Sequence, residues 1–360
     1  MQNKFSGIRI GFHILQSFPV SCLNRDDVGS PKSALIGGIP RARVSSQCWK
    51  RAVRLALHDL GIQIAERTKL VKAKIMEQCR MLDQNTSEEI VSEACDQAVK
   101  NITGEEKNAK NANEEDSKTL FFISNAEASL IARKLIEDSY KCPDAKTLIK
   151  LLNGRKFSSD LDGLDIALFG RMVASFPELN TEAAASFAHA ISTHKVTPEL
   201  DFFTAVDDRK SQDDSGAGHM GLLEYNSATY YRYVSLDLGQ LSFNLRTESI
   251  QDAVTAFMKA LFIAVPAARQ KTMAATCPWN YAIVTLRKGQ GIQMPFMAAV
   301  KPENGKDIVE CSKERLRKSF EDTQKMYGSL FGLLEKLEIS TQEGDIDSLC
   351  EKMVNKISTL

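Results

Sequence analysis

Basic side chains without acidic neighbours concentrate in one stretch of the sequence, residues 28–58. This stretch contains no Asp or Glu, although the whole chain balances 46 acidic against 46 basic residues. Its cations are Lys32, Arg41, Arg43, Lys50, Arg51 and Arg54. Clustered Lys and Arg side chains bind phosphate groups, and they attract nucleic acid without reading its bases. The stretch is therefore a candidate site for a phosphate backbone.

The second half of this stretch has the pattern of a helix with two different faces. Its polar stripe, at i, i+3, i+4 and i+7, consists of Gln47, Lys50, Arg51 and Arg54. The opposite stripe is apolar and consists of Trp49, Ala52, Val53, Ala56, Leu57 and Leu60. Ser45 or Ser46 is a suitable N-cap, and the free N–H groups of a helix N-terminus favour anions.

An ordinary solvated surface helix is the alternative interpretation of this pattern. The loop before the helix favours phosphate binding, because it adds flexible backbone and further cations at the same end. The loop residues concerned are Lys32, Gly37, Gly38, Arg41 and Arg43.

The sequence has no arrangement of acids, bases or nucleophiles that is typical of an enzyme. His189 and His194 are five residues apart, which does not place two metal ligands on one helix face. His219 lies near several aspartates in a polar connection, where solvated side chains are more common than ligands. Asp26 and Asp27 are expected to pair with Arg25. We therefore predict a protein that is not an enzyme and that needs no cofactor and no metal.

Composition excludes several other classes. The eight cysteines are scattered without a CxxC pair, which predicts reduced thiols in a cytoplasmic protein. No apolar run is long enough to span a membrane, so no membrane partner is expected. Overall neutrality argues against a wholly basic RNA-coating protein, yet it permits a local basic groove.

The remaining sequence predicts an α+β protein. Residues 5–18 are rich in Ile and Phe and alternate as in a strand, and residues 61–161 are mostly helical and polar with a linker at 101–118. The small residues at 183–193 predict a helix. Two strand-like runs around a polar, glycine-containing connection at 200–233 are typical of a long protruding hairpin. Such a hairpin usually rests on a partner, because isolated hairpins are marginally stable in water.

A set of motifs recurs in one order over about two thirds of the chain. They are SCLNRDD, the Gly37-Gly38 pair, RARVSSQCWKRAVR, DIALFGRM, AHAISTHKV, FFTAVDD and GAGHMG. In these motifs the sequence resembles the CasC backbone subunit of the type I-E CRISPR Cascade complex, within the RAMP superfamily. The resemblance implies a modified RRM-like or ferredoxin-like palm with a helical fingers insertion and a protruding β-hairpin thumb.

The implied division of the chain follows from this resemblance. Residues 1–60 form the first part of the palm with the basic helix, and residues 61–180 form the helical fingers subdomain. Residues 181–199 return to the palm, residues 200–224 form the thumb hairpin, and residues 225–360 form the second part of the palm.

The resemblance also implies a function. The chain would be a non-catalytic backbone subunit that polymerises along the CRISPR RNA (crRNA), grips its phosphates and kinks it with the thumb. Guide segments would then be displayed for pairing with target DNA in antiviral defence. The implied partners are crRNA, target DNA through guide pairing, further copies of the chain and other Cascade subunits. The alternatives are a stand-alone CRISPR RNA-processing endonuclease of the same superfamily, for which His13 would be a candidate, and a monomeric RNA-binding adaptor. RNA-cleaving relatives of this superfamily tend to carry a glycine-rich loop near the C-terminus. Because the last sixty residues of this chain contain only scattered glycines, we interpret His13 as a sheet residue.

The expected site residues come from the basic segment of the sequence and from the family resemblance. The basic segment and the loop before it supply Arg25, Lys32, Arg41, Arg43, Ser45, Gln47, Lys50, Arg51 and Arg54. The resemblance adds Arg171 and Met172, together with Phe203, Thr204 and Val206 at the root of the thumb. It also makes Lys301 a candidate contact with target DNA. Ile39-Pro40 stands where relatives often carry basic residues.

Overall fold

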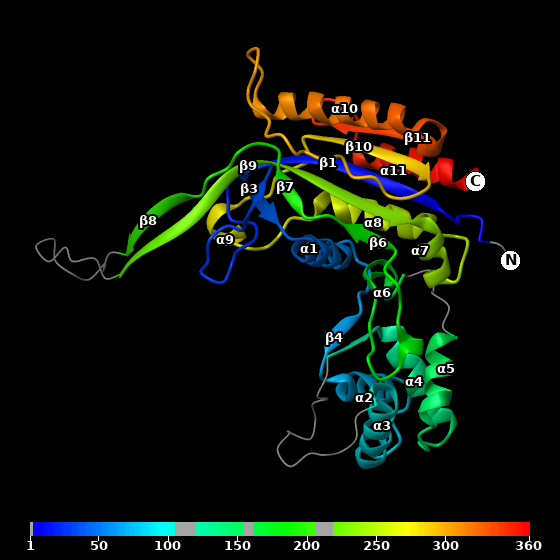
Figure 1. Ribbon diagram of the computed structural model, residues 1–360. Helices are drawn as coiled ribbons and strands as arrows, with labels where there is room; N and C mark the ends of the chain where they lie inside the picture. Colours follow the sequence, from blue (N-terminus) through cyan, green and yellow to red (C-terminus); the bar gives the residue numbers. More distant parts are fainter. Residues whose placement is uncertain (1–2, 105–119, 155–160, 206–218) are drawn as a thin grey trace, which may run out of the picture. The chain divides into compact units, whose positions relative to one another are not determined.

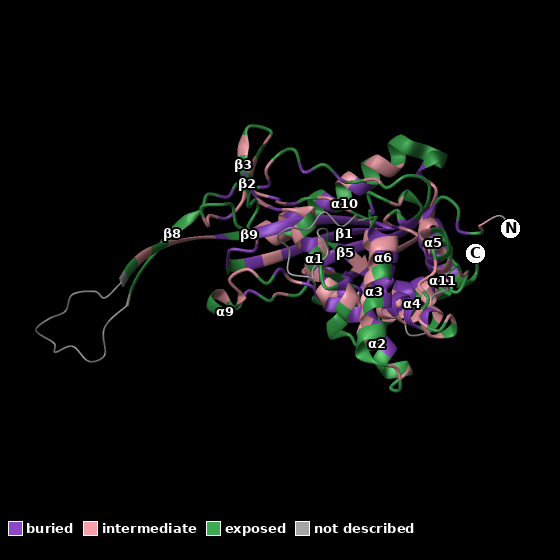
Figure 2. Ribbon diagram, turned by 90° about the horizontal axis from the view of Figure 1, so that it is seen from below, coloured by how far each residue is buried: buried purple, intermediate pink, exposed green. Residues whose placement is uncertain are grey.

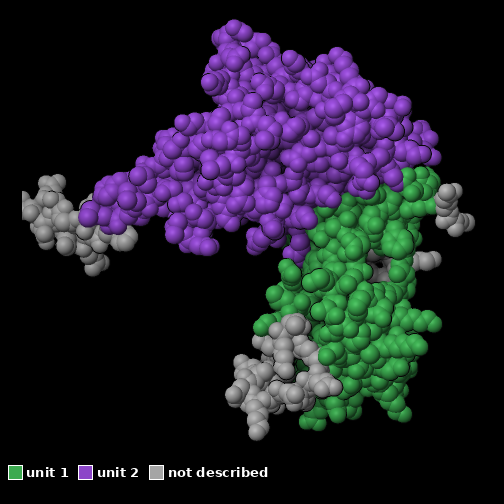
Figure 3. Space-filling view, in the orientation of Figure 1, with its two compact units in different colours: residues 1–6, 57–185, 237–256 green, residues 7–56, 186–236, 257–360 purple. Residues whose placement is uncertain are grey.

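A computed structural model describes residues 3–104, 120–154, 161–205 and 219–360. The chain forms two compact units (Figure 3). Unit 1 comprises residues 1–6, 57–185 and 237–256, and unit 2 comprises residues 7–56, 186–236 and 257–360. Most of the linker predicted at residues 101–118 lies outside the described residues.

Unit 2 is built on one extended sheet (Figure 1). Its strands neighbour one another in the order β11–β10–β1–β9–β7–β3–β2, and β6 and β8 also pair with β9. The bounds are β1 (Ile8–Ser21), β2 (Ser33–Ile36), β3 (Ile39–Val44), β6 (Ala185–Phe187), β7 (Ala190–Ser192), β8 (Glu199–Ala205), β9 (His219–Asp237), β10 (Tyr281–Lys288) and β11 (Leu333–Ser340). The strand predicted at residues 5–18 is confirmed as β1, which begins just after the left-handed Gly7 (φ +73°).

Helices pack on both faces of this sheet. The helices that lie wholly or partly in unit 2 are α1 (Ser46–Asp59), α8 (Gln251–Ile263), α9 (Gln270–Met273), α10 (Ile308–Tyr327), the short η2 (Gly328–Phe331) and α11 (Ile346–Ser358). Leu316 of α10 packs in a cluster with Leu15 and Tyr231 of the sheet. Trp49 of α1 packs in another cluster with Phe18 and Tyr230. Because neighbouring residues of a strand point to opposite faces, α10 and α1 cover opposite sides of β9.

Unit 1 is mainly helical. Its elements include β4 (Glu66–Thr68), α2 (Val71–Leu82), α3 (Glu88–Thr103), β5 (Phe121–Ile123), α4 (Asn125–Glu137), α5 (Ala145–Asn153), α6 (Leu164–Phe169), η1 (Pro177–Leu179) and α7 (Leu238–Leu245). Apolar residues of α2, α3, α4 and α5 share one core. The helical character predicted for residues 61–161 is therefore confirmed where the structure describes them. No described helix combines the length and apolar character that a membrane span requires.

The helix predicted at residues 183–193 is wrong. This segment forms β6 and β7 instead, and β7 lies between β3 and β9. Its backbone groups form hydrogen bonds with neighbouring strands; for example, Ala188 N donates to Tyr233 O at 3.0 Å. Helix propensity of small residues is a weak preference, and here the open position in the sheet overrides it.

The long hairpin predicted at residues 200–233 is present as β8 paired antiparallel with the first half of β9. The register sets Phe202 opposite Leu222 and Thr204 opposite Met220. Figure 2 shows that β8 is largely exposed, whereas β9 becomes buried where it enters the sheet. The connection at residues 206–218 lies outside the described residues.

Candidate nucleic-acid interface

The basic helix predicted from the sequence is α1, and Ser45 is its N-cap. The Ser45 hydroxyl accepts a hydrogen bond from Cys48 N at 3.3 Å, as expected for a residue just before the first turn. Trp49, Val53 and Leu57 are at most 1% exposed, so the apolar stripe faces the core. Of the opposite stripe, Gln47 and Arg51 are exposed and Lys50 and Arg54 are half-buried. The predicted stripe ends at Leu57, because α1 ends at Asp59 and Leu60 is 40% exposed.

The loop predicted before this helix is an ordered hairpin. β2 and β3 pair with Ile36 opposite Ile39, which leaves Gly37 and Gly38 as the two turn residues. Both have positive φ, +59° and +77°, which glycine adopts without strain and which suits a tight hairpin turn. A Cβ on Gly37 would lie 2.9 Å from Met297 O. The predicted loop is therefore a β-hairpin, and its cations Arg41 and Arg43 lie on β3.

Asn24, from the SCLNRDD motif, joins the hairpin to the helix N-terminus. Its backbone carbonyl accepts from Lys32 N at 2.9 Å, and its side-chain Oδ1 accepts from Ser45 N at 2.9 Å. Arg43 N in turn donates to Lys32 O at 2.9 Å. These bonds join the start of β2 to the start of α1, and they hold Lys32, just before β2, near the cations of α1.

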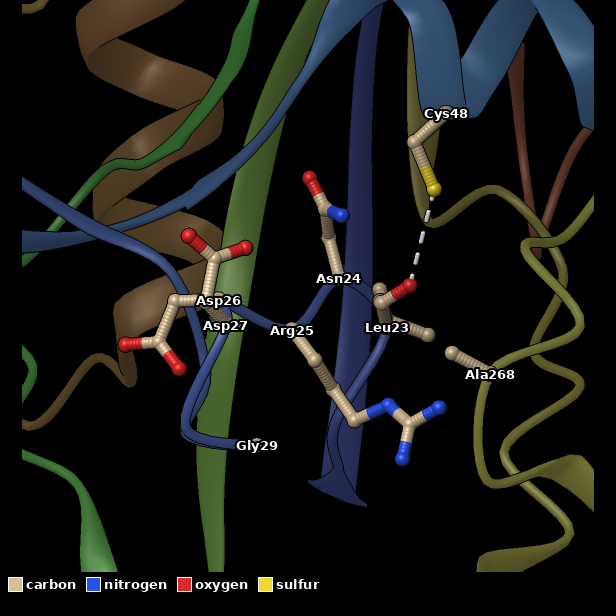
Figure 4. A pocket seen from close by; sticks show the side chains of 8 residues that line it. All are labelled: Leu23, Asn24, Arg25, Asp26, Asp27, Gly29, Cys48 and Ala268. Atoms are coloured by element: carbon tan, nitrogen blue, oxygen red, sulfur yellow. Dashed lines mark hydrogen bonds between the residues drawn. The ribbon is translucent and has the colours of Figure 1, made fainter.

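A surface hollow of about 450 Å³ lies beside this junction (Figure 4). It is lined by Leu23, Asn24, Arg25, Asp26, Asp27, Gly29, Cys48 and Ala268. The Asp26 carboxylate does not pair with Arg25 as expected. It accepts instead from Val28 N at 3.0 Å and Ser30 N at 2.9 Å, and Figure 4 shows the Arg25 guanidinium on the other side of the loop. Arg25 is exposed and is available to a ligand in this hollow.

Lys32, Arg43 and Arg51 form a positive cluster around the start of α1. Burial raises the pKa of the Cys48 thiol, while the nearby Lys32 and Arg51 oppose this rise. Burial lowers the pKa of His189, and Arg43 and Lys32 lower it further. Within the described part of the chain, no carboxylate forms an ion pair with any of these three cations. Their charge is therefore open to an anionic ligand.

Arg41 is a correction to the predicted set. It is 0% exposed, and its guanidinium donates to Ser192 O at 2.5 Å, Phe296 O at 2.9 Å and Met297 O at 3.3 Å. Burial lowers the pKa of Arg41. A side chain whose donors are used by buried carbonyls cannot reach a phosphate, so its role is to bind β3 to β7 and to the chain before Val300.

Replacing Arg41 should therefore lower the free energy of unfolding rather than weaken a surface contact. Arg41→Met leaves buried carbonyls without donors, and we expect a loss of about 2–4 kcal/mol in the free energy of unfolding, measured in urea. Arg51→Met is the matched control, because Arg51 is exposed, and it should change stability by less than about 0.5 kcal/mol. Equal losses in both variants would contradict the structural role of Arg41.

Trp49 is stacked inside the molecule rather than offered to a base. The Arg232 guanidinium lies 3.5 Å from the centre of the Trp49 ring, and Arg232 also donates to Gln16 Oε1. Burial lowers the pKa of Arg232 to about 9. The interface on α1 therefore presents charge and hydrogen-bond donors but no aromatic ring.

Arg171 is a second correction. Its side chain is 6% exposed and forms a buried ion pair with Glu127, at 2.9 Å between Nη1 and Oε1. It also donates to Leu179 O at 3.1 Å and to Phe122 O at 3.0 Å, so it links parts of unit 1. The adjacent Met172 is 85% exposed and remains a candidate contact. The resemblance placed both residues in the predicted set, but only the Met172 side chain is exposed.

The thumb hairpin has two different faces. Leu200, Phe202, Met220 and Leu222 are 60–65% exposed, and the register places Phe202 and Leu222 side by side. Phe203, on the other face, is 38% exposed and lies against Gly221, where a Cβ would come within 2.4 Å of the ring. Gly221 therefore leaves space for the Phe203 ring. Thr204 is exposed, and Val206 lies outside the described residues.

His13, the candidate of the endonuclease alternative, is buried in the sheet. It is 2% exposed, its Nδ1 lies 2.9 Å from the Tyr231 hydroxyl, and the Tyr233 ring packs on it. Burial, assisted by Arg287, lowers the pKa of His13 to about 3. No three His, Cys, Asp or Glu side chains of the described residues gather closely enough to hold a metal ion. Lys301 is exposed.

His189 and Gly221 are two residues of interest that the sequence analysis did not select. His189 approaches Arg43 across the sheet, with 3.2 Å between Nδ1 and Nη1. Both lie in motifs that had been noted, AHAISTHKV and GAGHMG. The position of His189 depends on the pairing of β7 with β3, which the mistaken helix at residues 183–193 concealed.

The chain is similar to subunits of CRISPR surveillance complexes. A chain from a structure titled "CRISPR RNA-guided surveillance complex, pre-nicking" is 27% identical, with a TM-score of 0.79, covering 97% of this chain and 100% of that one. A chain from a structure titled "CRISPR RNA-guided surveillance complex" is 22% identical and has the same fold, with a TM-score of 0.67, covering 96% of this chain and 99% of that one. Among curated protein sequences none matches.

These similarities confirm the α+β class and the resemblance to a subunit of a CRISPR surveillance complex, whereas the type I-E assignment stays a prediction. A family model described as "CT1975-like protein" matches residues 10–358. Because this match covers nearly the whole sequence, the chain belongs to the CT1975-like protein family.

Proposed function

We propose that this chain is a non-catalytic backbone subunit of a type I-E Cascade complex, which polymerises along crRNA in the cytoplasm. Its copies grip the phosphate backbone of the guide and kink it with the thumb, so that segments between the thumbs pair with target DNA. Its partners are crRNA, further copies of itself, other Cascade subunits and, through guide pairing, target DNA.

The observation that carries this proposal is the cation cluster at the start of α1. Lys32, Arg43 and Arg51 lie together without described carboxylate partners, beside the Ser45-capped helix N-terminus. Lys50 extends the same side of α1, with its Nζ 6.0 Å from the centre of the Phe187 ring. Such a surface binds consecutive phosphates and supplies no base recognition, because Trp49 is occupied by Arg232. Specificity is then left to guide pairing.

The exposed thumb supports the polymerising part of the proposal. A ribbon with apolar side chains such as Phe202 and Leu222 in water costs free energy unless a partner covers it. A neighbouring copy with its bound guide supplies that cover, with Phe203 and Thr204 against unstacked bases. Met172 is a further candidate contact with the guide, and the exposed Lys301 is a candidate contact with the target strand.

Electron microscopy of the protein purified with a co-expressed guide tests the proposal. We expect filaments or complexes in which copies repeat at a constant spacing and increase in number with guide length. A single copy on every guide, whatever its length, would support the monomeric adaptor instead.

We also predict that the isolated chain does not cleave its guide. His13 is only 2% exposed, and burial keeps its imidazole neutral at physiological pH. Labelled guide RNA should stay intact during incubation with the protein, both with and without Mg²⁺. Cleavage that His13→Ala abolishes would establish the endonuclease alternative, provided that the variant is as stable as the parent.

A further inference from the structure

We propose that His189 is an additional phosphate ligand of the nucleic-acid interface and that RNA binding at this position takes up a proton. The inference rests on the proposed RNA-binding function. His189 is exposed, and it lies between β6 and β7, next to Arg43 of β3. It thus borders the same cation cluster as Lys32.

Hydrogen-bond chemistry fixes the state of the free imidazole. Arg43 Nη1 lies 3.2 Å from His189 Nδ1, and a guanidinium can only donate. His189 Nδ1 must therefore accept, which puts the proton of the neutral ring on Nε2. No described residue engages Nε2 in a hydrogen bond, so this N–H is a donor available to a phosphate oxygen.

The neighbours of His189 favour its neutral form until an anion arrives. After burial, the causes that lower its pKa are Arg43 on β3 and Lys32 just before β2. Lys50 lies near the same segment through its contact with the Phe187 ring. No described carboxylate pairs with Arg43 or Lys32 to offset this field. The groups facing the imidazole are therefore cations.

A bound phosphate reverses this balance. Its negative charge attracts the imidazolium, so the pKa of His189 is higher in the complex than in the free protein. The complex then holds more protons, and affinity rises as pH falls through the pKa of the complex and levels off below the pKa of the free protein. A protonated His189 can no longer accept from Arg43 Nη1, and that N–H becomes available to the phosphate. Protonation thus converts a histidine–arginine contact into two donors for one anion.

Three of the other four histidines can be separated from this effect by their surroundings. His194 Nε2 accepts from Thr229 N at 3.2 Å, and His13 is buried against Tyr231. His58 is exposed at the C-terminal end of α1, 4.0 Å from Asp59. It is the matched control, because it lies on the same basic helix but outside the cluster.

Filter binding of radiolabelled oligouridine at constant ionic strength, from about pH 8 to about pH 5.5, tests the proposal. Uracil does not titrate in this range. We expect affinity to increase by about fivefold to tenfold as pH falls, as for a pKa that rises by about one unit on binding. His189→Gln should lose this increase, whereas His58→Gln should retain it. Calorimetry in two buffers of different ionisation enthalpy should detect proton uptake that His189→Gln removes.

Several outcomes would overturn the proposal. If His189→Gln kept the pH profile and the proton uptake of the parent, the role of His189 would be rejected. A parent whose affinity did not change with pH would reject it too. In both cases the proposed RNA-binding function would be unaffected. If oligouridine did not bind at any pH, or if Lys50→Ala with Arg51→Ala left its binding unaltered, the proposed interface would fail as well.

Discussion

A chain that lacks residues 209–220 is expected to fold normally and bind RNA, but to lose regular assembly along it. The deletion keeps most of the β8–β9 pairing, because the paired residues Phe203 and Gly221 remain and five residues, 204–208, connect them. Only the pairs of Thr204 with Met220 and of Ala205 with His219 are lost. Folding free energy comes mainly from apolar burial, and the deleted described residues, His219 and Met220, lie on the protruding ribbon. We therefore expect the free energy of unfolding to change by less than about 1 kcal/mol.

Sizing of complexes on guides of increasing length provides the measurement. The parent should add copies in regular steps, whereas the deletion variant should form irregular complexes or single-copy complexes. A finer variant is Phe203→Ala, which removes the ring that lies against Gly221 while both strands remain. Exchanging Lys318 of α10 for Ala, an exposed change on another element, is the control. Stepwise growth without residues 209–220 would show that the thumb does not space the copies.

Local patterns predicted the parts of this protein whose structure depends on neighbouring residues in the chain. The helical period of residues 46–59, the serine before it and the glycine-containing hairpin sequence were sufficient for α1, for its Ser45 cap and for the thumb strands. In each case the decisive interactions join residues that are close in sequence, such as Ser45 with Cys48.

Failures occurred where a long-range partner decided the outcome. Arg41 and Arg43 look equivalent in the sequence, but only the Arg41 guanidinium meets the carbonyls of Ser192 and Phe296, whereas Arg43 lies against His189. Arg171 follows a similar rule, because Glu127 lies 44 residues away and still determines its burial. A pattern of charges cannot distinguish a buried arginine from an exposed one when its acceptors come from other strands.

The helix predicted at residues 183–193 failed for a related reason. Small residues permit both helix and strand, and pairing of β7 with β3 and β9 selected the strand. This pairing also brings His189 to Arg43, a contact that a helix would not have made. The basic helix of the candidate site and Arg43 of β3 were therefore in the predicted set, whereas His189 beside Arg43 was missed.

Removal of Lys50 and Arg51 together is expected to weaken RNA binding strongly and equally for all sequences. The two side chains lie on the polar side of α1, and neither contributes to the apolar core around Trp49 and Val53. Each charge-assisted contact with a phosphate is worth about 1.5–3 kcal/mol, so Lys50→Ala with Arg51→Ala should reduce affinity by roughly 100-fold or more at low salt. The slope of log affinity against log salt should fall by about 1.4, because each lost contact with single-stranded RNA removes about 0.7.

The matched control for this variant removes the same two charges from another helix. Arg315 and Lys318 are exposed on α10, so Arg315→Ala with Lys318→Ala alters net charge identically. If both double variants lost affinity to the same extent, the effect would come from net charge and not from a site on α1. A loss of affinity that differed strongly between RNA sequences would also contradict the interface, because contacts to phosphates do not depend on the base sequence. Binding of homopolymers and mixed sequences at several salt concentrations separates these outcomes. A localised phosphate site on α1 lowers the salt slope in the α1 variant, whereas the α10 variant keeps the slope of the parent.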